Sequence, residues 1–112
     1  MKYLMLVHDD PDFAEPIGDS DPSAWVEDTT RRGVRLFGDR LRPADEATTV
    51  RVRGGETLVA DGPFVELREQ IGGFDLLEAA SREEAVAIAA AHPAARFGVI
   101  ELRELWPFPW DE

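Results

Sequence analysis

The sequence predicts a single α+β domain that spans residues 1–112. Two helical segments alternate with several short strands, which is typical of a mixed class rather than a helical bundle. A Gly-Gly pair at 54–55 joins two runs of β-branched residues and predicts a β-hairpin. The length suits one domain, because domains cluster at roughly 100–150 residues.

The first part of the chain is expected to form a strand, a helix and a second strand. Residues 2–8 carry apolar side chains on both faces, as in a central strand that is covered on both sides. Segment 9–19 is acidic and contains two prolines, which predicts a loop. The Asp-Pro pair at 21–22 favours the start of a helix that extends to about residue 32. Residues 34–37 then form a short strand.

The second part is expected to form the hairpin, a strand, a helix and a final strand. The hairpin covers residues 48–60, and residues 71–79 form the next strand. Ser81 and Glu84 have the spacing of a capping box, so a helix begins there and ends before Pro93. One face of that helix carries Ala85, Ile88, Ala89 and His92. The last strand covers residues 97–105.

This order, β-α-β, a hairpin and then β-α-β, is typical of a ferredoxin-like, split βαβ sheet with both helices on one face. The other face of the sheet would then be uncovered. A strand that is apolar on both sides needs a second cover, and a second copy of the chain is the simplest one. The sequence therefore predicts a homodimer.

Composition excludes several classes of function. The net charge is −11, with 12 basic residues against 23 acidic ones, so nucleic acid is not an expected partner. There are no cysteines, which excludes disulfides and thiolate metal sites. The apolar run at 3–7 is too short for a signal peptide or a membrane span, so we expect a cytoplasmic protein. No phosphate-binding loop or paired-histidine motif occurs, and no cofactor or metal is expected.

The run Asp61-Gly62-Pro63-Phe64, followed by Arg68-Glu69-Gln70-Ile71-Gly72-Gly73-Phe74, resembles the signature of the DGPF branch of the YCII-related family. The opening residues 1–6, the run 48–51 and the region 93–103 support the resemblance along nearly the whole chain. The resemblance implies a dimeric α+β barrel in which two ferredoxin-like sheets face each other. Members are mostly uncharacterised, and for YCII-like relatives a His and an Asp that meet in a cleft imply an enzyme.

His8 and Asp61 are the candidate catalytic residues. His8 ends the first strand, and histidine is the side chain best matched to proton transfer near neutral pH. Asp61 is a candidate acid, base or ligand anchor, but its motif also has a structural interpretation as a rigid turn. Pro63 fixes φ, Gly62 before it is driven towards extended geometry, and Phe64 has reason to bury its ring.

Phe64, Asp75 and Arg103 are the candidate ligand-binding residues. Arg103 shares one face of the last strand with Glu101, and Asp75 is expected on a neighbouring strand. If that face looks into the dimer cleft, these charges line a polar pocket, and otherwise they are ordinary surface. Strand register decides between the two, because a slip of one residue reverses every side chain.

His92 and the tail at 106–112 have structural interpretations. His92 lies in the last turn of a helix, where a partly positive imidazole complements the helix dipole. Trp106, Phe108 and Trp110 would form an unusual aromatic patch if they were left in water. We therefore expect the tail to dock on its own domain or across the dimer interface.

Two functions remain open from the sequence. In one, the dimer is a small-molecule enzyme with His8 as general base or acid and a carboxylate that orients it. In the other, it is a non-catalytic ligand-binding or regulatory dimer. The residues do not identify a substrate or a reaction.

Overall fold

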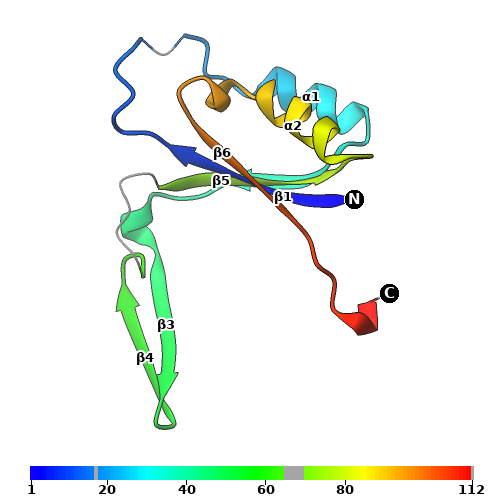
Figure 1. Ribbon diagram of the computed structural model, residues 1–112. Coiled ribbons are helices and arrows are strands. Elements are labelled where there is room, and N and C mark those ends of the chain that lie inside the picture. Colours follow the sequence, from blue (N-terminus) through cyan, green and yellow to red (C-terminus); the bar gives the residue numbers. More distant parts are fainter. Residues whose placement is uncertain (17, 65–69, 112) are drawn as a thin grey trace.

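A computed structural model describes residues 1–16, 18–64 and 70–111 of the chain (Figure 1). The expected strands and helices are all found, with small shifts at their ends. The strands are β1 (Lys2–Asp9), β2 (Arg35–Arg40), β3 (Thr48–Arg53), β4 (Glu56–Asp61), β5 (Ile71–Glu78) and β6 (Gly98–Glu104). The helices are α1 (Ser23–Arg31) and α2 (Arg82–Ala90), with short 3₁₀ turns at Ala44–Glu46, Pro93–Ala95 and Pro109–Asp111. None of these described helices is long and apolar enough to cross a membrane.

Four strands form one antiparallel sheet in the order β2-β5-β1-β6, which is the ferredoxin-like arrangement predicted from the element order. Both helices cover the same face of this sheet (Figure 1). Strands β3 and β4 pair only with each other, and we call this hairpin, residues 48–61, the arm. The arm extends away from the sheet on the side opposite the helices (Figure 1).

The core lies between the helices and the covered face of the sheet. Alternate residues of the two central strands point into it, because successive side chains of a strand face opposite sides. The buried cluster consists of Tyr3, Met5, Trp25, Leu77, Ala79, Ala85, Ile88 and Ala89. The predicted inward face of α2 is confirmed, because Ala85, Ile88, Ala89 and His92 are all buried.

The two helices begin in different ways. At α2 the Ser81 hydroxyl accepts a hydrogen bond from the Glu84 backbone N–H at 3.1 Å, as the capping motif predicts. At α1 no side chain caps the helix, and Pro22 occupies the cap position. Asp21 instead accepts hydrogen bonds from the side chain and the backbone N–H of Ser23, and these bonds lower the pKa of Asp21.

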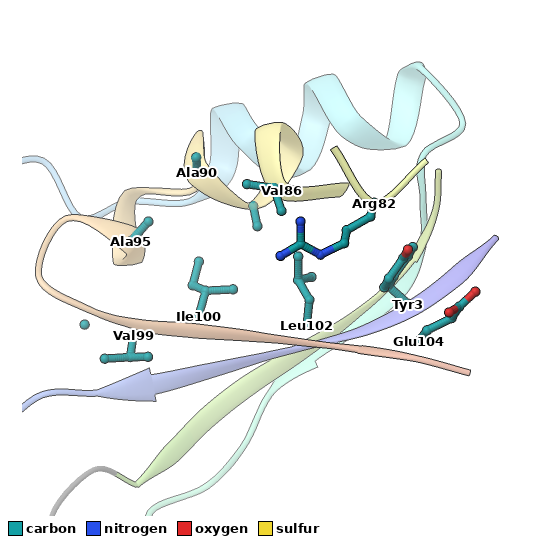
Figure 2. Close-up of a pocket in the computed structure, with 11 residues that line it drawn as sticks. Tyr3, Arg82, Val86, Ala90, Ala95, Val99, Ile100, Leu102 and Glu104 are labelled. Atoms are coloured by element: carbon teal, nitrogen blue, oxygen red, sulfur yellow. The ribbon is translucent and has the colours of Figure 1, made fainter. Parts of the chain in front are cut away.

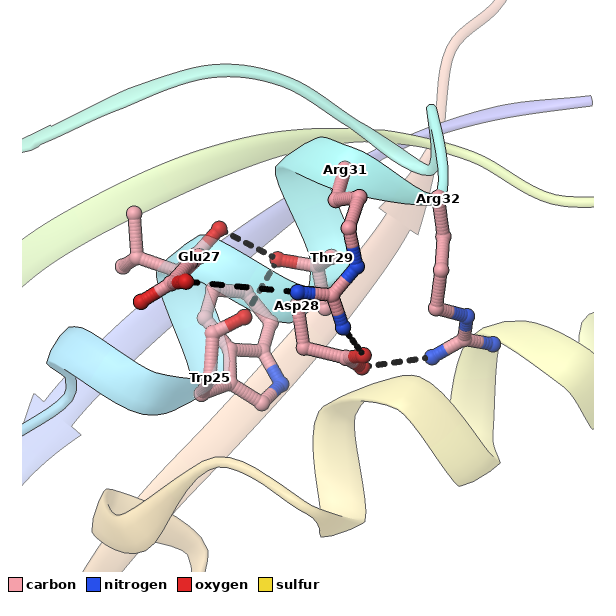
Figure 3. Close-up of polar contacts among 7 residues, drawn as sticks. Trp25, Glu27, Asp28, Thr29, Arg31 and Arg32 are labelled. Carbon is pink, nitrogen blue, oxygen red and sulfur yellow. Dashed lines mark hydrogen bonds and ion pairs between the residues drawn. The ribbon is translucent and has the colours of Figure 1, made fainter.

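The exposed side of α1 carries a small network of ion pairs (Figure 3). Asp28 accepts from Arg31 at 2.9 Å and from Arg32 at 3.1 Å. On the inward side, the Thr29 hydroxyl donates to the Trp25 carbonyl at 2.7 Å. Exposed pairs of this spacing stabilise a helix by only about 0.3–0.5 kcal/mol each, so packing of Trp25 holds α1 in place more than its charges do.

The Asp-Gly-Pro-Phe motif at 61–64 forms a turn that closes the base of the arm. The Gly62 N–H donates to the Ala47 carbonyl at 2.7 Å, and the Gly62 carbonyl accepts from the Thr49 hydroxyl at 2.8 Å. The structural interpretation as a turn is therefore supported, but the extended geometry expected of Gly62 and the burial expected of Phe64 are wrong. Gly62 has φ +96°, which a residue without Cβ adopts readily. Residues 68 and 69 of the wider signature lie outside the described residues.

Phe64 is exposed rather than buried, with 72% of its surface accessible. The reason is its place at the base of the arm, where the core does not extend. Its ring is covered on one side by the Arg51 guanidinium, whose carbon lies 5.1 Å from the ring centroid. This is the geometry of a cation–π contact.

The aromatic tail does not dock on its own domain, so that part of the prediction is wrong for the single chain. Trp106, Phe108 and Trp110 are 96%, 62% and 76% exposed. The tail leaves the edge strand β6 and runs away from the sheet (Figure 1). Phe108 and Trp110 stack on each other, with centroids 4.7 Å apart and an angle of 5° between the rings.

Candidate functional site

Two cavities open on the helix side of the sheet. One lies between α2 and β6, measures about 710 Å³ and has mainly apolar walls, with Arg82, Tyr3 and Glu104 at one end (Figure 2). The other, which we call the cleft, measures about 660 Å³. Both volumes lie in the usual range for small-molecule sites. The cleft contains Asp75 and His92, the two lining residues whose pKa values are shifted, and it also contains Arg35. Its rim carries the charged residues Asp9, Asp39, Arg40 and Arg42.

Asp75 points from β5 towards the helices, because it lies on the same face of the strand as Gly73 and Leu77, two residues away on either side, and that face is the covered one. Only 6% of its surface is exposed. The Arg35 Nε donates to Asp75 Oδ1 at 2.6 Å, and the Arg35 Nη2 donates to the Gly38 carbonyl at 2.8 Å. A buried carboxylate is tolerated when it is paired and hydrogen-bonded in this way.

Burial raises the pKa of Asp75, because the charged form loses its hydration. The hydrogen bond and charge of Arg35 act in the opposite direction, and so does the charge of His92, but burial has the larger effect. The carboxylate of Asp75 is therefore a stronger base than that of an ordinary aspartate. A carboxylate with a raised pKa is a typical general base.

His92 lies where α2 gives way to the turn at Pro93–Ala95, and 9% of its surface is exposed. Its Nδ1 accepts a hydrogen bond from the Ala94 backbone N–H at 3.0 Å. The neutral ring therefore carries its proton on Nε2. The ring packs edge-on against Trp25, with centroids 4.8 Å apart.

Burial lowers the pKa of His92, and the charge of Asp75 opposes this shift without reversing it. His92 is therefore a neutral hydrogen-bond donor near neutral pH. Asp75 and His92 line the same cleft, and each lies close enough for its charge to act on the pKa of the other. Because the pKa of Asp75 is raised and that of His92 is lowered, Asp75 is suited to act as the base and His92 as the hydrogen-bond donor.

Gly38 allows Arg35 and Asp75 to meet. A Cβ at this position would collide with the Asp75 carboxylate and the Phe74 carbonyl. Because β2 pairs with β5, with Gly38 opposite Asp75, only a residue without a side chain lets the two strands approach here. The geometry of the ion pair therefore depends on a glycine that makes no polar side-chain contact.

His8, the sequence-predicted base, lies on the opposite face of the sheet. Its Nε2 is 3.1 Å from Glu101 Oε1, and Arg103 Nη1 is 3.7 Å from Glu101 Oε2. The structure thus brings His8 together with Glu101, not with Asp61 or Asp75. Asp61 ends β4 in the arm, where it is exposed.

The sequence left open whether Asp75 lines a pocket with Glu101 and Arg103, and the structure places them on opposite faces of the sheet. Strand β1 separates β5 from β6 in the sheet. Asp75 points to the helices, whereas Glu101 sits opposite Leu6 and Arg103 opposite Leu4 on the uncovered face. The sequence missed His92 as a partner of Asp75, because that pairing depends on strand register and on the turn after α2.

The fold and the cleft define a small α+β protein with a four-stranded antiparallel sheet and a polar site between sheet and helices. The model of the YCII-related domain matches residues 1–109, so the chain belongs to the YCII-related family. An uncharacterised protein of Rhizobium meliloti (strain 1021) is similar, with 44% identity over 124 aligned positions that cover 94% of this chain and 92% of the relative. Neither match names a reaction.

Proposed function

We propose that the protein is a small-molecule enzyme and that the cleft around Asp75 and His92 is its acid–base site. The observation that carries this proposal is the pair itself, a carboxylate with a raised pKa beside a histidine with a lowered pKa in one cavity. Perturbed groups of this kind concentrate at functional sites. His8, with its neighbour Glu101, belongs to the uncovered face of the sheet and is the competing candidate.

The arrangement supports removal of a proton from a carbon next to a carbonyl group. In this reaction Asp75 takes the proton through the oxygen that Arg35 does not hold. The electron pair of the broken C–H bond forms a carbon–carbon double bond, and the π electron pair of the carbonyl group moves onto its oxygen. The Nε2–H of His92 donates a hydrogen bond to that oxygen. A neutral donor aimed at developing negative charge is an efficient form of stabilisation.

The cleft also favours a substrate that carries an anionic group. Arg40 lies at its rim and makes no ion pair or hydrogen bond through its side chain within the part of the chain that the structure describes. Arg42, its neighbour at the rim, is held by Glu46 at 2.8 Å. A guanidinium without a partner binds carboxylate or phosphate in a bidentate manner, so Arg40 is the residue that we expect to orient the substrate.

Hydrogen exchange tests this function without knowledge of the natural substrate. The protein is incubated in D₂O with a panel of small 2-keto acids, ketones and aldehydes, and NMR follows the loss of the α-proton signals. We expect catalysed exchange for at least one compound, its loss in Asp75→Asn and its retention in His8→Ala. Exchange that survives in Asp75→Asn but disappears in His8→Ala would move the site to the other face.

A second candidate is a non-catalytic ligand-binding protein that uses the same cleft. The short 2.6 Å hydrogen bond from Arg35 favours it, because a carboxylate held in this way acts as a fixed anchor for a ligand. The same panel separates the two functions. Saturable binding without exchange supports the receptor, and exchange supports the enzyme.

We also propose that the protein is a homodimer in which two uncovered sheet faces pack together as a dimeric α+β barrel. Support comes from the chemistry of that face. Its centre is apolar, with Leu4, Leu6, Phe37, Phe74 and Leu76, and charged groups lie at its edge. The Asp-Gly-Pro-Phe turn at 61–64 supports membership of the DGPF branch.

A further inference from the structure

The arm has one apolar face that none of the described residues covers. Val50 pairs with Val59 across the hairpin, and Val52 lies on the same side of it. These three side chains are 60%, 64% and 57% exposed. The opposite face carries charged residues such as Arg51. The arm is therefore an amphipathic ribbon, and an isolated two-stranded hairpin of this kind is marginally stable in water.

The size of the molecule shows how far the arm and tail stand away from the core. The radius of gyration is 16.4 Å, whereas a compact chain of this length has about 13 Å. Exposed apolar surface in extended segments is unusual for a soluble monomer and marks an interaction site.

The tail, residues 106–110, is the second uncovered apolar segment. Its three aromatic side chains are exposed, and Figure 1 shows that the tail and the arm leave opposite ends of the sheet. Both extend to the same side, the side away from the helices (Figure 1). They therefore flank the uncovered sheet face, on which the proposed homodimer rests.

We propose that the occupant of this space is a second copy of the chain and that the apolar face of each arm packs on the aromatic tail of the partner. The inference rests on the proposed dimer and adds one contact to it. We call this contact between the arm of one protomer and the tail of its partner the clasp. A two-fold axis that exchanges the two ends of the facing sheets brings each arm beside the partner's tail. Aromatic rings on β-branched side chains make favourable cross-strand contacts.

The arm is long enough for this role. Each of its strands has six residues, which span roughly 20 Å at about 3.3 Å per residue. Two sheets that pack face to face are only about 10 Å apart. The arm therefore spans the whole distance between the two sheets, along which the partner's tail extends in the opposite direction.

The clasp also connects the dimer to the cleft. The chain enters the arm through Leu41, Arg42, Pro43 and Ala44 and returns through Gln70 and Ile71, and these residues line the cleft. An arm that is held by a partner therefore fixes one wall of the cleft. A monomer would keep Asp75 and His92 but would lose this fixed wall.

Cross-linking between two variants tests the contact directly, because the wild-type chain has no cysteine. Tagged Val59→Cys protein is mixed with untagged Phe108→Cys protein until the two dimers have exchanged subunits. The mixture is then treated with a short bis-maleimide. We expect the tagged–untagged dimer to be the main product. Ala87→Cys, on the exposed side of α2, replaces Val59→Cys as the matched control and should give little product.

Three outcomes overturn the clasp. The first is a Val59→Cys and Phe108→Cys product no more abundant than that of the Ala87→Cys control. The second is a product in which Val59→Cys protein links mainly to itself, because the arms would then meet each other. The third is an unchanged dimer dissociation constant when residues 106–112 are deleted, where we expect a weakening of at least tenfold. Light scattering of the wild type separates the two proposals, because a monomer overturns both, whereas a dimer that fails the cross-linking test overturns only the clasp.

Discussion

At the level of single residues, the cleft depends on three groups whose positions in the sequence are far apart. Arg35, Asp75 and His92 come from β2, β5 and the turn after α2. Asp75 was a sequence-predicted ligand-binding residue, and its inward position between Gly73 and Leu77 is a readable signal. His92 was explained by the helix end, and it does cap a turn. Because the helix end already explained His92, the sequence offered no reason to place it near Asp75. Their proximity depends on the folded arrangement of β5 and α2.

The buried histidine predicts a pH dependence of stability. The pKa of His92 is lowered from 6.5 in the folded chain, so the unfolded chain takes up this proton first as the pH falls. The stability contributed by the neutral ring is complete above about pH 6.5 and is lost as the pH falls towards the folded pKa. In urea unfolding between about pH 5 and pH 8, His92→Gln should show a shallower pH dependence than the wild type.

Asp75 acts with the opposite sign, since a raised folded pKa contributes stability that is lost as the pH rises above its ordinary value of 3.8. The difference between wild type and His92→Gln at each pH is therefore the quantity to compare. Parallel curves for the two proteins would show that His92 does not titrate differently in the folded and unfolded states.

Gly38 provides a prediction about packing. In Gly38→Ala the new methyl group meets the Asp75 carboxylate and the Phe74 carbonyl, so β2 must shift and the Arg35–Asp75 hydrogen bond lengthens. We expect a loss of about 1–3 kcal/mol in the free energy of unfolding. Gly18→Ala is the matched control, because nothing lies within 4 Å of its Cβ position. Equal unfolding midpoints for the two variants would contradict the tight approach.

At the level of elements, the sequence was a good guide because local signals set the boundaries. The alternation in β1, the Gly-Gly turn of the arm and the serine cap of α2 all depend on neighbours in the chain. The side of the sheet on which each strand residue lies was harder to predict, because it depends on which strands pair. The sequence placed Asp75 on a strand next to that of Arg103 without fixing their faces, and the strand order β5-β1-β6 with its register puts them on opposite sides.

The cap of α2 gives a prediction at this level. Ser81→Ala removes the acceptor of the Glu84 N–H and should lower the free energy of unfolding by about 1 kcal/mol. Ser81→Asp keeps an acceptor oxygen at the cap and should restore most of the loss. Thermal or urea unfolding measures both, and an alanine variant as stable as the wild type would show that the cap contributes little.

At the level of the whole molecule, one face of the sheet, one face of the arm and the tail are left uncovered by residues 1–16, 18–64 and 70–111. This arrangement follows from placing both helices on one face of a sheet whose central strand β1 is apolar on both sides. The element order predicted the uncovered face. The sequence did not predict that the hairpin would stand apart from the sheet. The Gly-Gly turn predicts that its two strands pair with each other, but no local signal shows whether the hairpin also joins a larger sheet.

The uncovered face predicts the effect of a charge at its centre. Leu6 lies between Phe74 and Glu101 on neighbouring strands, so Leu6→Lys places a charge in the proposed sheet–sheet contact and should convert the dimer into a monomer. Ala87→Lys, on the exposed side of α2, should leave the mass unchanged. Light scattering of both variants at equal concentration checks this, and a dimeric Leu6→Lys protein would exclude that face as the interface.

We propose that the cleft around Asp75 and His92, not the cluster around His8, receives the small molecule. The most direct measurement is NMR of the labelled wild-type protein during titration with the compounds of the keto-acid and aldehyde panel. We expect binding to shift the ring signals of His92 and the backbone signals around Asp75, with little change at His8. Shifts that concentrate at His8 and Glu101 while His92 stays constant would contradict it.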